Sequence, residues 1–496
     1  MVYDLVVIGG GINGVGIAAD AAGRGLSVLL AEMGDLGGGT SSRSSKLVHG
    51  GLRYLEQYAF RLVRESLQER EVLLAKAPHI IWPLRFVLPQ VPGGRSRFLL
   101  RAGLFLYDHL GHRRRIPPSS VLDLTREPAG RPLRPELTDG FAYWDCWVDD
   151  ARLVVLNARA AADFGAVIET RSRVDTIAAD GDWWRITLRS GTGAREVRAR
   201  ALVNAAGPWV QQAAEKVGIG RTHAREPLRL VKGSHIVVPR IAGADDAYLC
   251  QSPDGRVVFA LPFEERFTLI GTTDVAYAGD PAEVAISRQE EDYLLDLANR
   301  FFAEEMSRSD IVWTYAGVRP LYDDESKDPS SVTRDYRLEL TAEPGTPPLL
   351  TVLGGKLTTY RRLAEAALEK LALHLPPMLP AWTATACLPG GDIGEGGFED
   401  FVARLQRSRP AFDPVFLGRI ARRYGTLIDE VLGDATSPAD LGAQLGGSLT
   451  AREVAYLIER EWARSSDDVL WRRTKCGLHM TARERSAAAE LIAKMI

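Results

Sequence analysis

Short runs of apolar residues, each about the length of a strand, mark the predicted sheets of this chain. Residues 3–8, YDLVVI, precede the glycine-rich GGGINGVG, a helical stretch IAADAAGRG and a second apolar run, SVLLAE. A continuous apolar run of this length is typical of a strand buried on both faces. The pattern therefore predicts a strand–helix–strand unit at the amino terminus.

The segments that follow do not alternate as regularly as in a plain doubly wound domain. Charged and apolar spacing predicts a long helix over about 53–77. Apolar runs predict strands at Ala166–Thr170, Trp184–Arg189, Ala201–Asn204, His235–Pro239, Val257–Pro262 and Thr268–Gly271. We therefore expect these strands to form a mixed sheet.

The amino-acid composition of the chain changes from about Leu388. A glycine-rich linker, PGGDIGEGGFED, leads into a stretch rich in Ala, Leu, Arg and Glu that continues to the end. These residues favour helix. We predict a separate all-α domain at 388–496.

Composition and charge exclude several classes of function. The 496 residues are 46% hydrophobic and 25% charged, as in soluble globular proteins. The formal charge is −3, so no basic excess recruits nucleic acid. The four cysteines are far apart and form no C-x-x-C, so we expect neither a disulfide framework nor a bound metal. No run of about 18 apolar residues occurs, and the first residues lack the basic leader of a signal peptide. We expect a protein of the cytoplasm or of the cytoplasmic membrane surface.

Three glycines between the first strand and the first helix form a dinucleotide-binding motif. Gly9, Gly11 and Gly14 satisfy G-x-G-x-x-G. They allow a tight turn, close approach to a pyrophosphate, and close packing of helix on strand. The helix amino terminus then offers N–H groups to the phosphates. Glu32 ends the second strand 18 residues after Gly14, where its carboxylate can bind the adenosine ribose and would disfavour the 2′-phosphate of NADP.

The residues after Glu32 favour FAD over NAD. An NAD-binding domain would continue with another regular strand–helix unit, but the chain instead enters the Ser/Gly-rich stretch 37–51. A second apolar strand that ends in small residues, ALVNAAGPW at 201–209, can bring its backbone close to the same large cofactor. We therefore predict FAD.

Several segments together resemble the FAD-dependent glycerol-3-phosphate dehydrogenases. IGGGINGVGIAADAAGRG (8–25) resembles the family's first signature and GGKLTTYRRLA (354–364) its second. SSRSSKLVHGGLRYLE, VNAAGPW, KGSHIVV, IGTTD and AGVRPL are similar to intervening family segments, in the family's order. EWARSSDDVLWRRTKCGL (461–478) resembles the family's helical cap. The resemblance covers nearly the whole chain.

The resemblance implies an α/β flavoprotein fold of the glutathione-reductase and D-amino-acid-oxidase type. We expect a discontinuous Rossmann-like FAD-binding domain at 1–75, 150–225 and 312–375, and a mixed-sheet domain facing substrate and membrane at 76–149 and 226–311. The implied reaction is oxidation of sn-glycerol 3-phosphate to dihydroxyacetone phosphate, with electrons passed to a membrane quinone. The implied cofactor contacts are Gly9, Gly11, Asn13, Gly14, Glu32, Thr40, Ser41, Ser45, Lys46, Leu47, Ala206, Gly207, Trp209, Gly355, Lys356, Leu357 and Thr358.

A small dianionic substrate requires fixed cations beside the flavin. Arginine suits phosphate because its planar fork can bond two oxygens. The candidates, which coincide with family positions implied to surround substrate, are Arg53, Arg319, Arg334 and Lys356, and Tyr54 adds a hydroxyl donor. Arg334 lies in a polar loop and could instead pair with Asp335.

Removal of the hydroxyl proton calls for a base with a pKa near neutrality, which points to histidine. Of the eight histidines, His49 and His235 lie in cofactor- or substrate-like segments, and the choice between them stays open. Arg319 and Lys356 are predicted to stabilise the developing alkoxide.

Two alternatives to the quinone-linked enzyme remain at this point. The related glycerophosphate oxidases share these motifs and pass electrons to oxygen. A flavin-binding regulatory protein would keep the fold without turnover, but it would not need Arg53, Arg319 and Lys356 together. A homodimer is left open.

Residues 95–115, RSRFLLRAGLFLYDHLGHRRR, predict an amphipathic helix with an unusually wide apolar face. Six arginines accompany a single aspartate, and Arg97, Arg101, Asp108 and His112 fall in a narrow polar stripe. Such a helix suits a lipid interface. The competing interpretation is a helix packed between domains, since apolar width alone does not separate protein from lipid.

Overall fold

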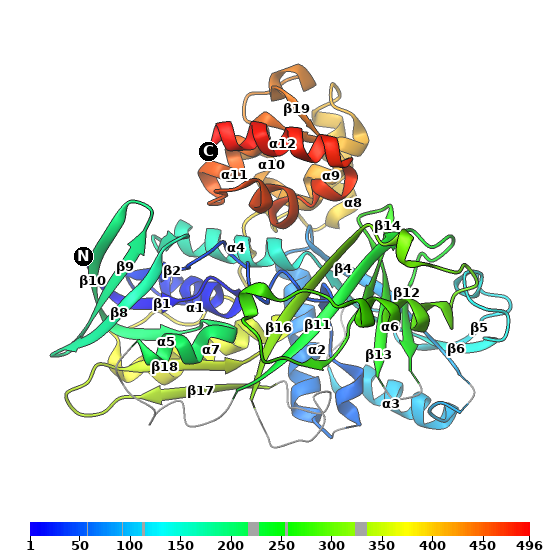
Figure 1. Cartoon of the computed structure of the whole chain (residues 1–496), viewed down its shortest axis with the longest axis horizontal. Helices are drawn as coiled ribbons and strands as arrows, with labels where there is room; N and C mark the ends of the chain where they lie inside the picture. The colour runs from blue at the N-terminus through cyan, green and yellow to red at the C-terminus, as the bar shows by residue number, and fades with distance from the viewer. Residues whose placement is uncertain (57, 92, 112–114, 217–227, 253–255, 323–334) are drawn as a thin grey trace.

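The computed structural model describes residues 1–56, 58–91, 93–111, 115–216, 228–252, 256–322 and 335–496. Two large sheets form the body, and a cluster of helices from the carboxyl-terminal part of the chain lies above them (Figure 1). Within the described ranges, the α-helices of the body are α1 (Ile12–Gly23), α2 (Phe60–Lys76), α3 (Arg97–Leu110), α4 (Asp150–Asp163), α5 (Val210–Glu215), α6 (Arg288–Asn299) and α7 (Tyr360–Leu371).

The first sheet is built around parallel strands in the order β17-β18-β10-β1-β2-β7, with the β8–β9 hairpin joined to β10. From β18 to β7 all neighbours are parallel, and β17 is antiparallel to β18. Its strands are β1 (Val2–Ile8), β2 (Val28–Ala31), β7 (Val167–Glu169), β8 (Arg173–Asp180), β9 (Trp183–Ser190), β10 (Gly193–Asn204), β17 (Tyr336–Thr341) and β18 (Leu349–Gly354). Leu5, Val6 and Val7 are fully buried, which confirms that β1 is covered on both faces.

Three strand ends of this sheet meet at one edge. Ile8 of β1 pairs with Asn204 of β10, and Asn204 pairs with Thr351 of β18. Because these strands are parallel, the turns at 9–14, 205–209 and 354–358 leave the sheet on the same side. In open α/β sheets this edge is where ligands bind.

The second sheet has the order β15-β11-β14-β13-β12-β4-β6-β3, with β16 paired to β11 and β5 paired to β6. Helix α6 packs on β11, β13 and β14, and begins with a capping box formed by Ser287 and Glu290. The strands are β3 (Leu47–Val48), β4 (Ile81–Pro89), β5 (Ser120–Asp123), β6 (Asp139–Val148), β11 (Leu228–Pro239), β12 (Ala247–Gln251), β13 (Val257–Phe263), β14 (Phe267–Gly271), β15 (Val275–Ala276) and β16 (Trp313–Tyr322).

The structure confirms the expected α/β architecture, and all six strands predicted between 166 and 271 are present, although they are divided between the two sheets and do not form the single mixed sheet expected from the sequence. Two further details differ from the sequence-based expectation. Strands β3 and β16 lie in the second sheet, although the expected boundaries grouped them with the first, because β16 pairs along its whole length with β11. The expected helix over 53–77 begins only at Phe60, since Tyr58 adopts a left-handed backbone with φ 55° that separates a 3₁₀ turn at Leu52–Leu55 from α2.

The carboxyl-terminal domain is helical, as predicted, with one small addition. It contains α8 (Gly397–Ser408), α9 (Pro414–Tyr424), α10 (Ile428–Leu432), α11 (Ala451–Arg460), α12 (Ala482–Met495) and the two-stranded β19 (Gln444–Gly446) and β20 (Leu449–Thr450). A core of its own includes Leu417, Tyr424 and Leu457.

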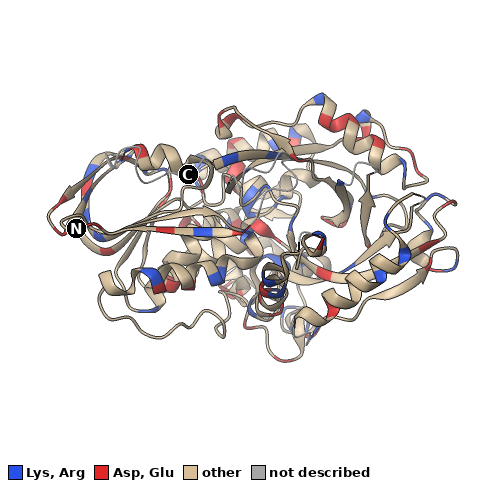
Figure 2. Cartoon of the chain, turned by 90° about the horizontal axis from the view of Figure 1, so that it is seen from below, with Lys and Arg blue, Asp and Glu red and all other residues tan. Residues whose placement is uncertain are grey.

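Lys and Arg positions lie among Asp and Glu positions along the ribbon in Figure 2. This distribution agrees with the formal charge of −3. No helix in the described part of the chain combines the length and the apolar character needed to cross a membrane.

Candidate cofactor and substrate site

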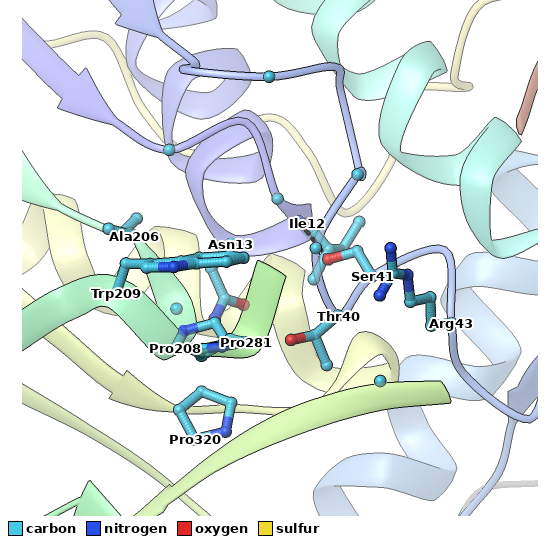
Figure 3. A pocket seen from close by; sticks show the side chains of 18 of the residues that line it. Ile12, Asn13, Thr40, Ser41, Arg43, Ala206, Pro208, Trp209, Pro281 and Pro320 are labelled. Atoms are coloured by element: carbon cyan, nitrogen blue, oxygen red, sulfur yellow. Dashed lines mark hydrogen bonds between the residues drawn. The ribbon is translucent and has the colours of Figure 1, made fainter. Parts of the chain in front are cut away.

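A cavity of about 980 Å³ opens at the edge where β1, β10 and β18 end. This is the upper end of the range of small-molecule sites. Figure 3 shows Trp209 and Pro208 on one side of it and Thr40, Ser41 and Arg43 on the other. The predicted cofactor contacts that line it are Gly9, Gly11, Asn13, Glu32, Thr40, Ser41, Ser45, Leu47, Ala206, Gly207, Trp209, Gly355, Lys356, Leu357 and Thr358.

The three glycines of the motif each occupy a position that a side chain would obstruct or crowd. Gly9 has φ +105°, and a Cβ there would lie 2.6 Å from the carbonyl oxygen of Ala205. A Cβ on Gly14 would lie 1.9 Å from the carbonyl oxygen of Gly9, so this glycine lets α1 pack against the strand without itself lining the cavity. Gly11 lines the cavity, where a Cβ would narrow the approach of a ligand to the backbone.

The amino terminus of α1 presents polar groups to the cavity. Its cap residue, Gly11, offers no side chain, and the N–H of Ile12 donates to Ser41 Oγ at 3.0 Å. Asn13 Nδ2 donates to the carbonyl oxygen of Gly354 at 3.2 Å, while Asn13 Oδ1 is buried with no partner among the described residues. The first turn contains no acidic residue, so the partial positive charge of the helix end is available to an anion.

Glu32 lies at the end of β2, on the wall of the cavity. Its carboxylate accepts hydrogen bonds of 2.6 Å from the N–H groups of Gly10 and Gly34. Burial raises the pKa of Glu32 above its ordinary value, against the opposing effect of these two N–H groups. The carboxylate therefore joins the glycine turn to the loop after β2, at the position expected for the adenosine ribose.

At the other end of the site, four predicted substrate or catalytic residues line the same cavity: His49, Tyr54, Arg319 and Lys356. The ammonium of Lys356 lies 3.8 Å from the centre of the Tyr54 ring, a cation–π contact. Arg319 of β16 donates to Thr272 Oγ1 at 3.0 Å and forms an ion pair with Asp274. A Cβ on Gly233 would lie 2.4 Å from Arg319 Nη2, so the guanidinium rests directly against the β11 backbone.

The two candidate histidines have different positions. His49 lines the cavity, and its backbone N–H donates to Thr358 Oγ1 at 3.3 Å. His235 is buried behind the wall, stacks on Tyr315 with ring centres 4.7 Å apart, and has Nε2 2.9 Å from Ser45 Oγ. Burial, followed by the charges of Arg319 and Lys46, holds the pKa of His235 well below 6.5, so its imidazole is neutral.

Two other predicted residues, Lys46 and Arg53, do not line the cavity. Lys46 is buried, and its ammonium lies 2.9 Å and 3.0 Å from the two carboxylate oxygens of Asp150. This ion pair joins the loop that precedes β3 to the first residue of α4. Arg53 is half-buried outside the cavity wall, and Arg334 lies outside the described residues.

Comparison with known proteins places the chain in a family. The family model of FAD-dependent oxidoreductases matches residues 4–361. The chain belongs to that family. A second model, the carboxyl-terminal domain of alpha-glycerophosphate oxidase, matches residues 381–496 of this oxidoreductase.

Two curated relatives and one solved structure resemble the oxidoreductase along almost its whole length. It is 53% identical to the glycerol-3-phosphate dehydrogenase of Pseudomonas aeruginosa, over 97% of its own length and 93% of that protein's. It is 51% identical to the D-erythritol 1-phosphate dehydrogenase of Brucella abortus, over 98% and 97%. The structure of the glycerol-3-phosphate dehydrogenase from Bacillus halodurans complexed with FAD has a TM-score of 0.75 at 28% identity, covering 99% of this chain and 95% of that one.

The residues present fit FAD. The cavity runs from Glu32 past the amino terminus of α1 to Lys356, as an extended dinucleotide requires. Asn13 Oδ1, which has no partner in the part of the chain that the structure describes, and the uncapped helix end are polar groups that a bound cofactor would satisfy. The bound flavin would supply the hydride acceptor, and the chain supplies the contacts that hold and orient it.

Sequence reasoning missed several residues of the wall. Arg43 lies in the serine-rich loop, and Arg171 and Ser172 follow β7. Ser465, Asp467, Asp468 and Arg472 come from the carboxyl-terminal domain. The loop after β7 carries no recognised motif, and the segment 461–478 carries only its resemblance to a helical cap.

Replacement of Glu32 by alanine is expected to weaken FAD binding by roughly 1–3 kcal/mol, the usual cost of losing charge-assisted hydrogen bonds. The variant also loses the acceptor for Gly10 and Gly34. The dissociation constant, measured by flavin fluorescence, checks this. Glu459→Ala, which removes an exposed acid on α11, is the control and should bind FAD as the unmodified protein does. An unchanged FAD dissociation constant in Glu32→Ala would contradict the role of Glu32.

The pH dependence of kcat at saturating substrate tests His235 as the base, because kcat/KM would also report the second ionisation of the substrate phosphate at about pH 6. If neutral His235 accepts the substrate proton, the enzyme keeps its activity as the pH falls through 6.5. Activity is lost only well below that value, because the pKa of His235 is depressed. A midpoint near 6.5 in the unmodified enzyme would remove His235 from this role. In the His235→Gln variant, the fall in activity at low pH that protonation of His235 causes should be absent.

Proposed function

We propose that this oxidoreductase oxidises sn-glycerol 3-phosphate to dihydroxyacetone phosphate and passes the electrons to a membrane quinone. The observation that carries the proposal is the position of Arg319 and Lys356, two cations on the wall at one end of a cavity built for FAD. The relatives named glycerol-3-phosphate dehydrogenase, at 53% and 28% identity over nearly the whole chain, support the same substrate.

In the proposed reaction a base accepts the hydroxyl proton of the secondary alcohol, and a bound flavin would supply the acceptor for the carbon-bound hydride. Arg319 and Lys356 hold the phosphate dianion and stabilise negative charge on the reacting oxygen. The Tyr54 hydroxyl is a further hydrogen-bond donor on the same wall. His49 faces the cavity directly, whereas His235 reaches it through Ser45, so both remain candidates for the base.

The relative that acts on D-erythritol 1-phosphate gives a specific second candidate for the substrate, because its identity of 51% is almost the same. Both compounds present a phosphate monoester and a nearby secondary hydroxyl, and they differ in the length of the polyol. Steady-state kcat/KM values for the two phosphates and for unphosphorylated glycerol test the assignment. We expect sn-glycerol 3-phosphate to be the best substrate and glycerol to be inert. A higher kcat/KM for D-erythritol 1-phosphate would overturn it.

The exposed residues of α3 support a membrane quinone as the proposed electron acceptor. Phe98, Leu99 and Phe105 are 84%, 55% and 64% exposed, whereas Leu104 and Tyr107 are buried against the body. Ser96 caps the helix, and Arg97 and Arg101 are exposed beside the apolar residues. His112, Arg113 and Arg114 lie outside the described residues. An exposed apolar face with adjacent arginines suits a peripheral position on the cytoplasmic membrane surface, where a quinone is accessible.

The identity of the electron acceptor is tested by comparing the rate at which the enzyme reduces a quinone analogue with the rate at which it forms peroxide. We expect electrons to pass to the quinone, with little peroxide formed in air. Peroxide formation in step with substrate consumption would identify the oxygen-reducing oxidase instead.

A further inference from the structure

Four residues of the carboxyl-terminal domain lie on the wall of the cofactor cavity. They are Ser465, Asp467, Asp468 and Arg472, which we call the carboxyl-terminal wall. The residues of the body around them are Glu32, Asp35 and Arg171, at the ends of β2 and β7. A backbone hydrogen bond joins the loop after β7 to the loop after β2, since the N–H of Arg171 donates to the carbonyl oxygen of Gly34 at 3.0 Å. The carboxyl-terminal wall therefore faces the adenosine end of the site, beside Glu32.

Ion pairs of two buried carboxylates, Asp35 and Asp468, hold this wall against the body. Asp35 accepts two hydrogen bonds of 2.8 Å from the guanidinium of Arg473. Asp468 accepts bonds of 2.8 Å and 2.7 Å from Arg171. Arg472 pairs with both Asp35 and Asp468. Burial alone would raise the pKa of Asp35, but the charges of Arg473 and Arg472 outweigh it and lower the pKa to about 2. Asp35 is therefore ionised at every physiological pH.

Two guanidinium groups, one from each part of the chain, face the same cavity. Arg43 lies in the serine-rich loop and donates to the carbonyl oxygen of Ala316 at 3.1 Å. Burial, followed by the positive charge of Arg472, lowers the pKa of Arg43 below its ordinary value. Both arginines line the cavity, and the diphosphate of a dinucleotide is an anion that two guanidinium groups can bind together.

We propose that the carboxyl-terminal domain is part of the FAD site, where it closes the adenosine diphosphate half and supplies Arg472 as a cation to the diphosphate. The proposal depends on FAD as the cofactor and not on the identity of the substrate, so its failure would leave the glycerol 3-phosphate assignment untouched. On this account the carboxyl-terminal wall slows the release of FAD, because the adenosine diphosphate half is enclosed between two parts of the chain.

Arg472→Met is the direct test. The substitution removes the cation but leaves Asp35 paired with Arg473 and Asp468 paired with Arg171, so the wall stays attached to the body. We expect the FAD dissociation constant of the full-length protein to rise at least about tenfold, in line with the loss of a charge-assisted phosphate contact. ADP, bound by the protein after removal of FAD and measured by calorimetry, should weaken by a similar factor. Riboflavin, which lacks the adenosine diphosphate, should bind unchanged.

Arg419→Gln is the matched control. Arg419 also joins the carboxyl-terminal domain to the body, through a 2.9 Å ion pair with Glu265, but neither residue lines the cavity. FAD and ADP should bind this variant as they bind the unmodified protein. Arg472→Lys keeps the charge and should recover part of the lost ADP affinity. The unfolding midpoint of each protein without FAD shows whether it is folded.

Two outcomes would overturn the proposal. The first is a folded Arg472→Met protein that binds FAD and ADP as tightly as the unmodified protein does. The second is an equal loss of riboflavin and ADP affinity, which would show a general loosening of the site instead of a contact with the diphosphate.

Discussion

Replacement of Lys356 by methionine is expected to lower kcat/KM for sn-glycerol 3-phosphate at least about a hundredfold, the usual loss when a stabiliser of developing negative charge is removed. The same result is expected for Arg319→Met. Both cations line the cavity together with His49 and Tyr54, and neither belongs to the glycine motif at 9–14. The variants should therefore still be yellow, and steady-state kinetics normalised to bound flavin measures the effect.

The matched control for this prediction is Lys370→Met. Lys370 is an exposed lysine in the last turn of α7, the helix that follows Lys356, so the substitution is chemically the same but lies outside the site. Its kcat/KM should equal that of the unmodified enzyme. If Lys356→Met or Arg319→Met stayed within a few-fold of the unmodified enzyme, the binding of phosphate and alkoxide would have to be assigned to other residues.

Loss of membrane binding is the second large effect we expect, on changing Phe98, Leu99 and Phe105 together to serine. These side chains are exposed on α3 while its other face packs on the body. Burying a large apolar side chain in lipid contributes roughly 1.5–3 kcal/mol. The triple variant should therefore float with anionic liposomes at least ten times less well than the unmodified protein. Salt should weaken the residual binding, because the contribution of the arginines is screened.

A control triple variant removes equally exposed apolar residues elsewhere. Leu373, Leu379 and Val415 are 95%, 62% and 58% exposed and lie outside α3. Their replacement by serine should leave flotation unchanged. Equal flotation of the folded, flavin-loaded α3 variant would contradict the membrane role of this helix. Absence of binding by the unmodified protein would favour a soluble enzyme that reduces oxygen.

The nucleotide-binding end of the site could be predicted because its determinants are local. Gly9, Gly11, Gly14 and Glu32 lie within one strand–helix–strand unit, so their spacing fixes their relative positions. Arg319 and Lys356 could be assigned only through the resemblance of their segments to a family, since pairing between distant strands brings them to the cavity. Local patterning also failed at Tyr58, where a left-handed backbone interrupts an otherwise helical spacing.

Helix α3 and the carboxyl-terminal wall show two further limits of the sequence. The sequence pattern predicts a wide apolar face on α3, but it does not show that Leu104 and Tyr107 are buried against the protein while Phe98 and Phe105 are exposed. Tyr107 is held there by hydrogen bonds with Asp145 and with the N–H of Gly50, contacts that depend on the tertiary fold. Arg472 lies 437 residues from its partner Asp35, a separation that no local motif can bridge.

Anaerobic mixing of the purified flavoprotein with sn-glycerol 3-phosphate tests the central claim most directly, because it needs neither a quinone nor a membrane. The account predicts rapid loss of the absorbance of oxidised flavin, with one dihydroxyacetone phosphate formed for each flavin reduced, and no bleaching by glycerol. Flavin that stays oxidised at saturating sn-glycerol 3-phosphate would contradict the assignment of Arg319 and Lys356 to a glycerol 3-phosphate site.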